Sequence, residues 1–139
     1  NKGWYPQWCC SGNGIPFSFT ETVDDFDIEM LAEYGSKRNI SLVGHHETGG
    51  QIQNYENQLE DAFKLYNKYG IKNIKTGYVN DVSKNIKRTD NNGDIIREWH
   101  HGQYMVNHFQ KVIELAAKYK LNIIKYNYFT IYIIHGKCD

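Results

Sequence analysis

Hydrophobic positions along the chain follow two alternating spacings, which predict helices and short strands in turn. Apolar residues recur at every third or fourth position near 27–37, 55–66 and 105–119. This spacing lines one side of a helix with apolar side chains, so we expect three helices there. A short apolar run follows each of them, at 40–44, 71–75 and 121–124. Runs of this length are typical of buried strands.

Polar residues and glycines mark where these elements begin and end. The aspartates of 24–27 offer N-caps for the first helix, and Gly70 follows the second helix in the usual C′ position. The cluster 90–94 indicates a turn within a long polar loop over 80–98. Residues 1–23 show no period and are expected to form an aromatic-rich loop.

The alternation of strands and helices predicts an α/β protein with parallel strands and about three strand–helix units. A length of 139 residues suits one domain. Sixteen basic residues balance sixteen acidic ones, and the pI is near 7.2. This balance disfavours nucleic acid as a partner. No run of about 18 apolar residues is present, which disfavours a membrane partner as well.

The candidate chemistry lies at the end of the first expected strand. His45, His46 and Glu47 follow it and precede the glycine pair 49–50. In parallel α/β folds the carboxyl ends of the strands meet at one rim, where active sites lie. Lys75 and Tyr78, at the exit of the second strand, would reach the same rim. Glu47 is the expected acid–base residue.

Two other interpretations of this region stay open. The first is a polar loop in which the histidines are merely solvated. The second is a metal site, because imidazole groups bind zinc and copper well. Its candidate ligands would be His45, His46, His100, His101 and His108.

Segments 45–56, 75–79 and 99–108 together resemble the catalytic barrel of glycoside hydrolase family 97, whose members are α-glucosidases and α-galactosidases. The resemblance implies a partial TIM (β/α)8 barrel. Residues 1–124 would be a fragment of that catalytic barrel, with the three strands as its third, its fourth and the start of its fifth. Residues 125–139 depart from the family pattern and are expected to be an unrelated or aberrant C-terminal tail.

The resemblance also implies roles for individual residues. Glu47 would be the general base of an inverting enzyme. Gly77 occupies the position where the retaining branch of the family carries its aspartate nucleophile, which favours the inverting, α-glucosidase-like branch. The residues implied to bind the sugar are His45, His46, Lys75 and Tyr78.

Other parts of the family's machinery come from segments after the fifth strand. They include the general acid and the calcium-binding glutamates, so calcium is implied for the parent family, with its ligands absent from this chain. The implied partner is an α-linked glucosyl oligosaccharide, and the implied location of a bacterial member is periplasmic or secreted. Hydrolysis needs two carboxyl groups, so the alternative is a catalytically incomplete fragment with no activity of its own.

Overall fold

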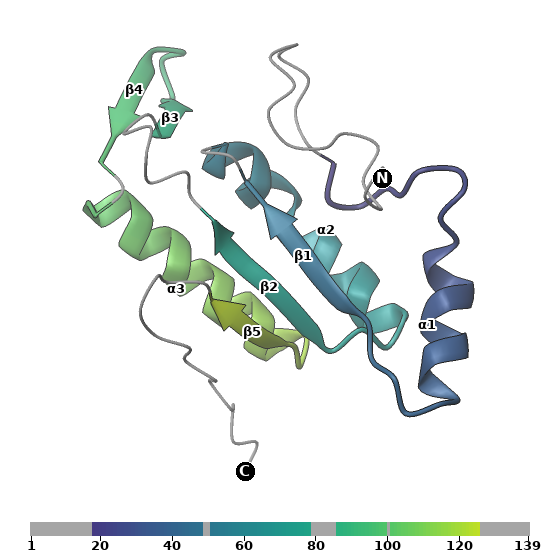
Figure 1. The fold of residues 1–139 in the computed structure, drawn as a ribbon. Helices are drawn as coiled ribbons and strands as arrows, with labels where there is room; N and C mark the ends of the chain where they lie inside the picture. The colour runs from purple at the N-terminus through teal and green to yellow at the C-terminus, as the bar shows by residue number, and fades with distance from the viewer. Residues whose placement is uncertain (1–17, 49–50, 79–85, 100, 126–139) are drawn as a thin grey trace.

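The computed structural model describes residues 18–48, 51–78, 86–99 and 101–125 (Figure 1). All three expected helices and all three expected parallel strands are present in the expected order, together with a hairpin that was not expected. The elements are α1 (Ile28–Ser36), β1 (Val43–Glu47), α2 (Ile52–Lys68), β2 (Asn73–Tyr78), β3 (Ile86–Thr89), β4 (Ile95–Glu98), α3 (Gln103–Lys118) and β5 (Asn122–Lys125). The α/β class is therefore confirmed.

The main sheet has three parallel strands in the order β1-β2-β5. Their arrowheads point the same way in Figure 1. β2 lies in the centre, with Ile74 beside Gly44 on one side and beside Ile123 on the other. The carboxyl ends of β1 and β2 therefore lie next to each other.

All three helices pack on one face of this sheet. One buried cluster joins Ala32 of α1, Phe63 of α2, Val112 of α3 and Ile74 of β2. Phe63 and Ile74 have no exposed surface. Because the helices share one core, this face of the sheet is buried, and it carries apolar side chains together with buried polar ones near the carboxyl ends of β1 and β2. Within the described ranges, no helix is both long and apolar enough to cross a membrane.

The other face of the sheet, called the open face below, carries the residues that alternate with the buried ones. Val43 is 49% exposed, and its neighbours across the sheet are Asn73 and Asn122. The amide of Asn122 donates a hydrogen bond to the side-chain oxygen of Asn73 at 3.1 Å. His45, Lys75 and Ile124 form the next row. None of the described helices covers this face (Figure 1).

The first strand begins three residues later than the sequence pattern predicted. Ile40, expected in a buried strand, is 58% exposed and belongs to the turn after α1. Its N–H donates to the carbonyl oxygen of Gly35, and Asn39 before it has a φ of 56°. β1 consequently runs through His45, His46 and Glu47, which the pattern had assigned to a loop. β2 and β5 also begin later than predicted, by two residues and by one.

The segment predicted as a polar loop contains the hairpin β3–β4. The predicted turn at 90–94 is confirmed, because one side-chain oxygen of Asp90 accepts from the N–H groups of Asn92 and Asp94, each at 2.9 Å. Gly93 there has a φ of 90°. The strands pair antiparallel, and their apolar positions form neither an alternating pattern nor a run longer than two residues. The lack of a regular pattern is why hydrophobic spacing missed them.

Candidate functional site

The strand ends bring four of the predicted site positions together. In the register of β1 with β2, His45 pairs with Lys75, and Glu47 pairs with Tyr78. Two neighbouring parallel strands thus present these positions at one rim, as the sequence suggested. His45 and Lys75 lie on the open face and are partly exposed.

The pairing is irregular at this rim. Between His45 and Glu47 the strand β1 has one residue, whereas between Lys75 and Tyr78 the strand β2 has two. The extra residue forms a bulge that includes Gly77. Bulges bend a strand and re-aim its side chains, and they are common next to active sites.

His46 does not share the surroundings of His45. Its ring is fully buried on the helix side of the sheet. The Nδ1 atom lies 2.7 Å from the hydroxyl of Tyr55, and the Nε2 atom lies 2.7 Å from the hydroxyl of Tyr66. Both tyrosines come from α2. The residue that the resemblance placed beside the sugar thus has its two ring nitrogens bonded to the helix layer.

Two further bonds extend this group of residues. The Thr76 hydroxyl donates to the Tyr55 hydroxyl at 3.1 Å, and the Tyr66 hydroxyl donates to the carbonyl oxygen of Phe19 at 3.4 Å. The Phe19 ring also packs on His46, with ring centroids 5.2 Å apart. These five residues are called the His46 chain below.

Burial controls the charge of the His46 chain. Removal from water, with a smaller contribution from nearby His45, lowers the pKa of His46 from 6.5 to about 3. Burial also raises the pKa of the Tyr55 hydroxyl far above its ordinary value of 10. His46 is therefore a neutral hydrogen-bonding group at neutral pH, and it is not an acid–base catalyst.

Sequence reasoning missed Tyr55, Tyr66 and Thr76 as members of this region. One signal was present, since residues eleven apart on a helix lie three turns apart on the same side. Tyr55 and Tyr66 have that separation. The pattern read them only as apolar core positions.

The two other histidines that the structure describes, His101 and His108, have different surroundings. His108 of α3 is 2% exposed and bonds Glu56 of α2 through Nδ1 at 2.8 Å. His101 contacts the ring of Trp99 edge-on, and His100 lies outside the described residues. Among the side chains that the structure describes, no three histidine, cysteine or acidic groups are close enough to hold a metal ion.

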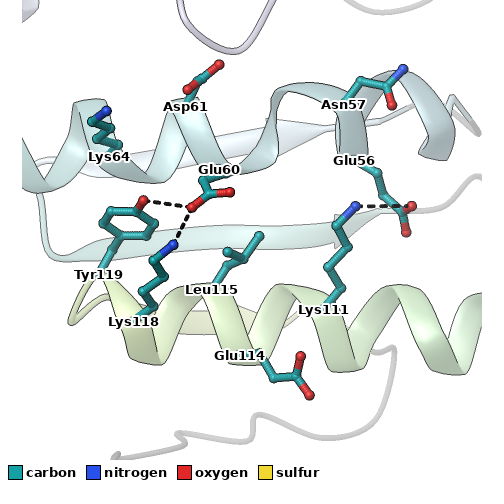
Figure 2. A pocket seen from close by; sticks show the side chains of 10 residues that line it. All are labelled: Glu56, Asn57, Glu60, Asp61, Lys64, Lys111, Glu114, Leu115, Lys118 and Tyr119. Atoms are coloured by element: carbon teal, nitrogen blue, oxygen red, sulfur yellow. Dashed lines mark hydrogen bonds and ion pairs between the residues drawn. The ribbon is translucent and has the colours of Figure 1, made fainter.

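A groove of about 570 Å³ runs between α2 and α3 (Figure 2). Two of the four carboxylates that line it, those of Glu56 and Glu60, are paired with cations. Glu60 bonds Lys118 and also accepts from the Tyr119 hydroxyl at 2.9 Å, and Glu56 lies 3.7 Å from Lys111. These partners hold the pKa of Glu60 below its usual value, as His108 does for Glu56. Ionised, paired carboxylates are poor general acids, so the rim of β1 and β2 remains the candidate site.

The chain belongs to glycoside hydrolase family 97. Its sequence matches that family, described as Glycoside hydrolase 97, over residues 1–130. The match runs past residue 124, where the barrel fragment was expected to end. β5 likewise includes Lys125, the first residue of the expected tail, while residues 126–139 lie outside the described ranges.

Solved structures of a family 97 enzyme from Pseudoalteromonas sp. strain K8 agree with this assignment. One is a complex with acarbose and another is a variant in complex with panose. In each comparison the sequences are 47% identical, the TM-score is 0.80, and the match covers 88% of this chain. It covers 19% of the other chain, so these 139 residues span about a fifth of the length of that enzyme.

Proposed function

We propose that this chain forms part of the (β/α)8 barrel of a family 97 glycoside hydrolase that cleaves α-glucosidic bonds with inversion. The observation that carries the proposal is the shared rim of β1 and β2, where His45 and Glu47 pair with Lys75 and Tyr78. Family membership supplies the reaction class. The rim supplies a place for it, since barrel enzymes work at the carboxyl ends of their strands.

The open face supports the barrel. In a (β/α)8 barrel one face of each strand points to the helices and the other to the interior. The described sheet has this asymmetry, with a largely apolar helix side and an open face that carries Asn73, Asn122, His45 and Lys75. No described helix covers the open face (Figure 1), as expected for the interior side of a barrel strand.

Glu47 is the proposed general base. An inverting glycosidase uses one carboxylate to activate water on one side of the sugar and a carboxylic acid on the other side to protonate the leaving group. Position 47 ends β1 beside the bulge at Gly77. In this proposal the glycine leaves room for the water where a retaining enzyme would have its nucleophile, about 5–5.5 Å from the acid.

The proposed substrate is an α-linked glucosyl oligosaccharide. Acarbose and panose, found in complexes of the relative, are α-linked saccharides. His45, Lys75 and Tyr78 are the proposed sugar-binding groups of this chain, because hydroxyl groups are fixed by a few polar side chains placed at a rim. His46 is not proposed to touch the sugar, because it is buried on the helix side.

Calcium is implied by the family, but the described residues do not fit a calcium site. Calcium takes six to eight oxygen ligands, and no group of three acidic or histidine side chains is found in the described ranges. No step of the proposed reaction therefore passes through the metal here. Because the reaction also needs a second carboxyl group, we expect the 139 residues alone to be inactive.

The test uses an intact enzyme in which residues 18–125 of this chain replace the matching segment of the Pseudoalteromonas enzyme, called the intact enzyme below. Glu47→Gln should lower turnover of panose by a factor of about 10² to 10⁴, the usual effect of a positioned base. Acarbose binding should change little, because the amide has nearly the same shape. NMR of the sugar first released by the unsubstituted enzyme should show the β anomer.

The matched control is Glu33→Gln on α1. Glu33 is an exposed carboxylate paired with Lys37 one turn away, so its loss should leave turnover unchanged. A Glu47→Gln enzyme with nearly full turnover would remove Glu47 as the base. Release of the α anomer would assign the chain to the retaining branch.

A further inference from the structure

The hydrogen bonds of the His46 chain all run in one direction from donor to acceptor. A hydroxyl group has one hydrogen to donate. Tyr66 gives its hydrogen to the carbonyl oxygen of Phe19, so it must accept from Nε2 of His46. Tyr55 accepts from Thr76, so its own hydrogen is available for Nδ1 of His46. The order of donation is therefore Thr76, Tyr55, His46, Tyr66, Phe19.

This order defines the state of the imidazole. Neutral histidine has one donor nitrogen and one acceptor nitrogen, and the chain requires the hydrogen on Nε2. Burial lowers the pKa of His46 to about 3, which agrees with a ring that accepts at Nδ1 and does not carry a second proton. Each buried polar group of the chain then has a partner, as buried polar groups require.

We propose that His46 is a positioning residue for the reaction at the rim. It holds the carboxyl ends of β1 and β2 against α2, and so fixes where the residues beside it in the two strands point. His46 lies between His45 and Glu47, and Thr76 follows Lys75 directly. This inference rests on the proposed function, because it assigns those neighbours to the sugar and the water.

The irregular pairing of the two strands explains why such a group is needed. Backbone pairing fixes β1 against β2 at His45 and again at Glu47, but the bulge interrupts it between them. His46 is the residue opposite the bulge. Where the backbone pairing is interrupted, its two hydrogen bonds to α2 hold β1 at a fixed distance from the helix layer. Thr76, in the bulged strand, is fixed to the same Tyr55 hydroxyl.

Small displacements at such a site affect the rate strongly. Misplacing a reacting group by about 1 Å can lower a rate by a factor of about 10². In the intact enzyme, Tyr66→Phe and His46→Leu should therefore lower kcat for panose by about 10- to 100-fold, with a smaller change in KM. His46→Gln should recover part of the loss, since its amide can still donate to Tyr66.

Turnover must be counted for each folded site. Calorimetric titration with acarbose gives the number of binding-competent sites, and kcat is divided by that number. The matched control is Tyr34→Phe, because Tyr34 is 54% exposed on α1 and removal of its hydroxyl should change nothing. If the variants lose sites but keep kcat per site, His46 only stabilises the fold and the positioning role is wrong.

Neutron crystallography of the deuterium-exchanged intact enzyme tests the direction of the chain without using activity. Deuterium is expected on Nε2 of His46 and not on Nδ1. Deuterium on Nδ1 would overturn the proposed order.

The kinetic variants also separate this inference from the proposed base. Unchanged kcat per site would end the positioning role even if Glu47→Gln behaves as proposed. Reduced kcat per site beside a fully active Glu47→Gln enzyme would keep the positioning role and remove the base.

Discussion

Two adjacent histidines at the end of β1 have opposite surroundings. His45 lies on the open face and is partly exposed, while His46 is buried among aromatic rings. The alternation of a strand produces this difference, because successive side chains point to opposite faces. One residue type therefore serves two purposes in consecutive positions, a polar group at the rim and a neutral member of the core.

The buried imidazole makes stability depend on pH in a defined range. Above pH 6.5, His46 is neutral in both the folded and the unfolded protein and adds no pH dependence. Below pH 6.5 the imidazole of His46 binds a proton in the unfolded chain, whereas in the folded chain it stays neutral down to about pH 3. The free energy of unfolding should therefore fall with decreasing pH in this window, by at most about 1.4 kcal/mol per pH unit from this group.

Melting of the intact enzyme at pH 7.5 and pH 5.0 measures the effect. His46→Leu should lower the melting temperature at both pH values. The unfolded variant has no imidazole at position 46 that could be protonated. The decrease between the two pH values should therefore be smaller in the variant than in the unsubstituted enzyme. Equal decreases of the melting temperature in the two proteins would mean that folding does not lower the pKa of His46.

The helices α2 and α3 end in the same way but with different residues. In both, a residue with positive φ follows the last turn, Gly70 with 70° and Lys120 with 54°. The next N–H bonds back to a carbonyl oxygen of the last turn, from Ile71 to Tyr66 and from Leu121 to Ala116. This is a Schellman-type ending, for which glycine is the usual residue. Lys120 therefore holds a backbone conformation that side chains disfavour.

Lys120→Gly should stabilise the protein. The left-handed conformation costs a residue with a side chain about 1–2 kcal/mol. Glycine avoids this cost, but it loses more backbone entropy on folding, which offsets part of the gain. A net gain of about 0.5–1 kcal/mol in the free energy of unfolding is expected. Gly70→Ala is the reverse experiment and should destabilise by a similar amount, because a side chain disfavours the positive φ of this position. An added Cβ would meet no atom within 4 Å, so no steric clash adds to that cost. Stabilisation by Gly70→Ala would contradict this account.

At the scale of elements, hydrophobic spacing predicted the helices better than the strands. Helices α1 and α3 have nearly the predicted bounds, and α2 starts three residues early at Ile52. The strand β1 was predicted too early because Ile40 and Leu42 are apolar, whereas its last three residues are polar. A strand that ends in a candidate site carries polar side chains on one face, so a hydrophobic run underestimates its length.

The rim could be predicted, but the His46 chain could not. Parallel strands bring their carboxyl ends together whatever their sequence, which is why His45 and Lys75 were expected to be neighbours. The partners of His46 depend on where α2 packs. Tyr55 and Tyr66 reach the imidazole only because that packing points their hydroxyl groups at it. Sequence spacing shows only that Tyr55 and Tyr66 lie on the same side of α2, and not which residue they contact.

At the scale of the whole molecule, the described sheet is covered on one face and open on the other. Its outer strands β1 and β5 each pair on one side only within the described ranges. Unpaired strand edges promote association with other chains. We expect the 139-residue chain, expressed alone, to self-associate and to bind a hydrophobic dye, as measured by sedimentation velocity and fluorescence. A monomer with a sharp cooperative melt would contradict this expectation.

The His46 chain also restricts the evolution of this segment. His46, Thr76, Tyr55 and Tyr66 come from two strands and one helix, and each satisfies a buried polar atom of another. Changing one of them removes a hydrogen bond from a buried polar group, at a cost of about 1–3 kcal/mol where a donor or acceptor is left unsatisfied, whereas exchanging the whole set for apolar side chains can be nearly neutral. We therefore expect relatives either to keep the four residues together or to have replaced them together.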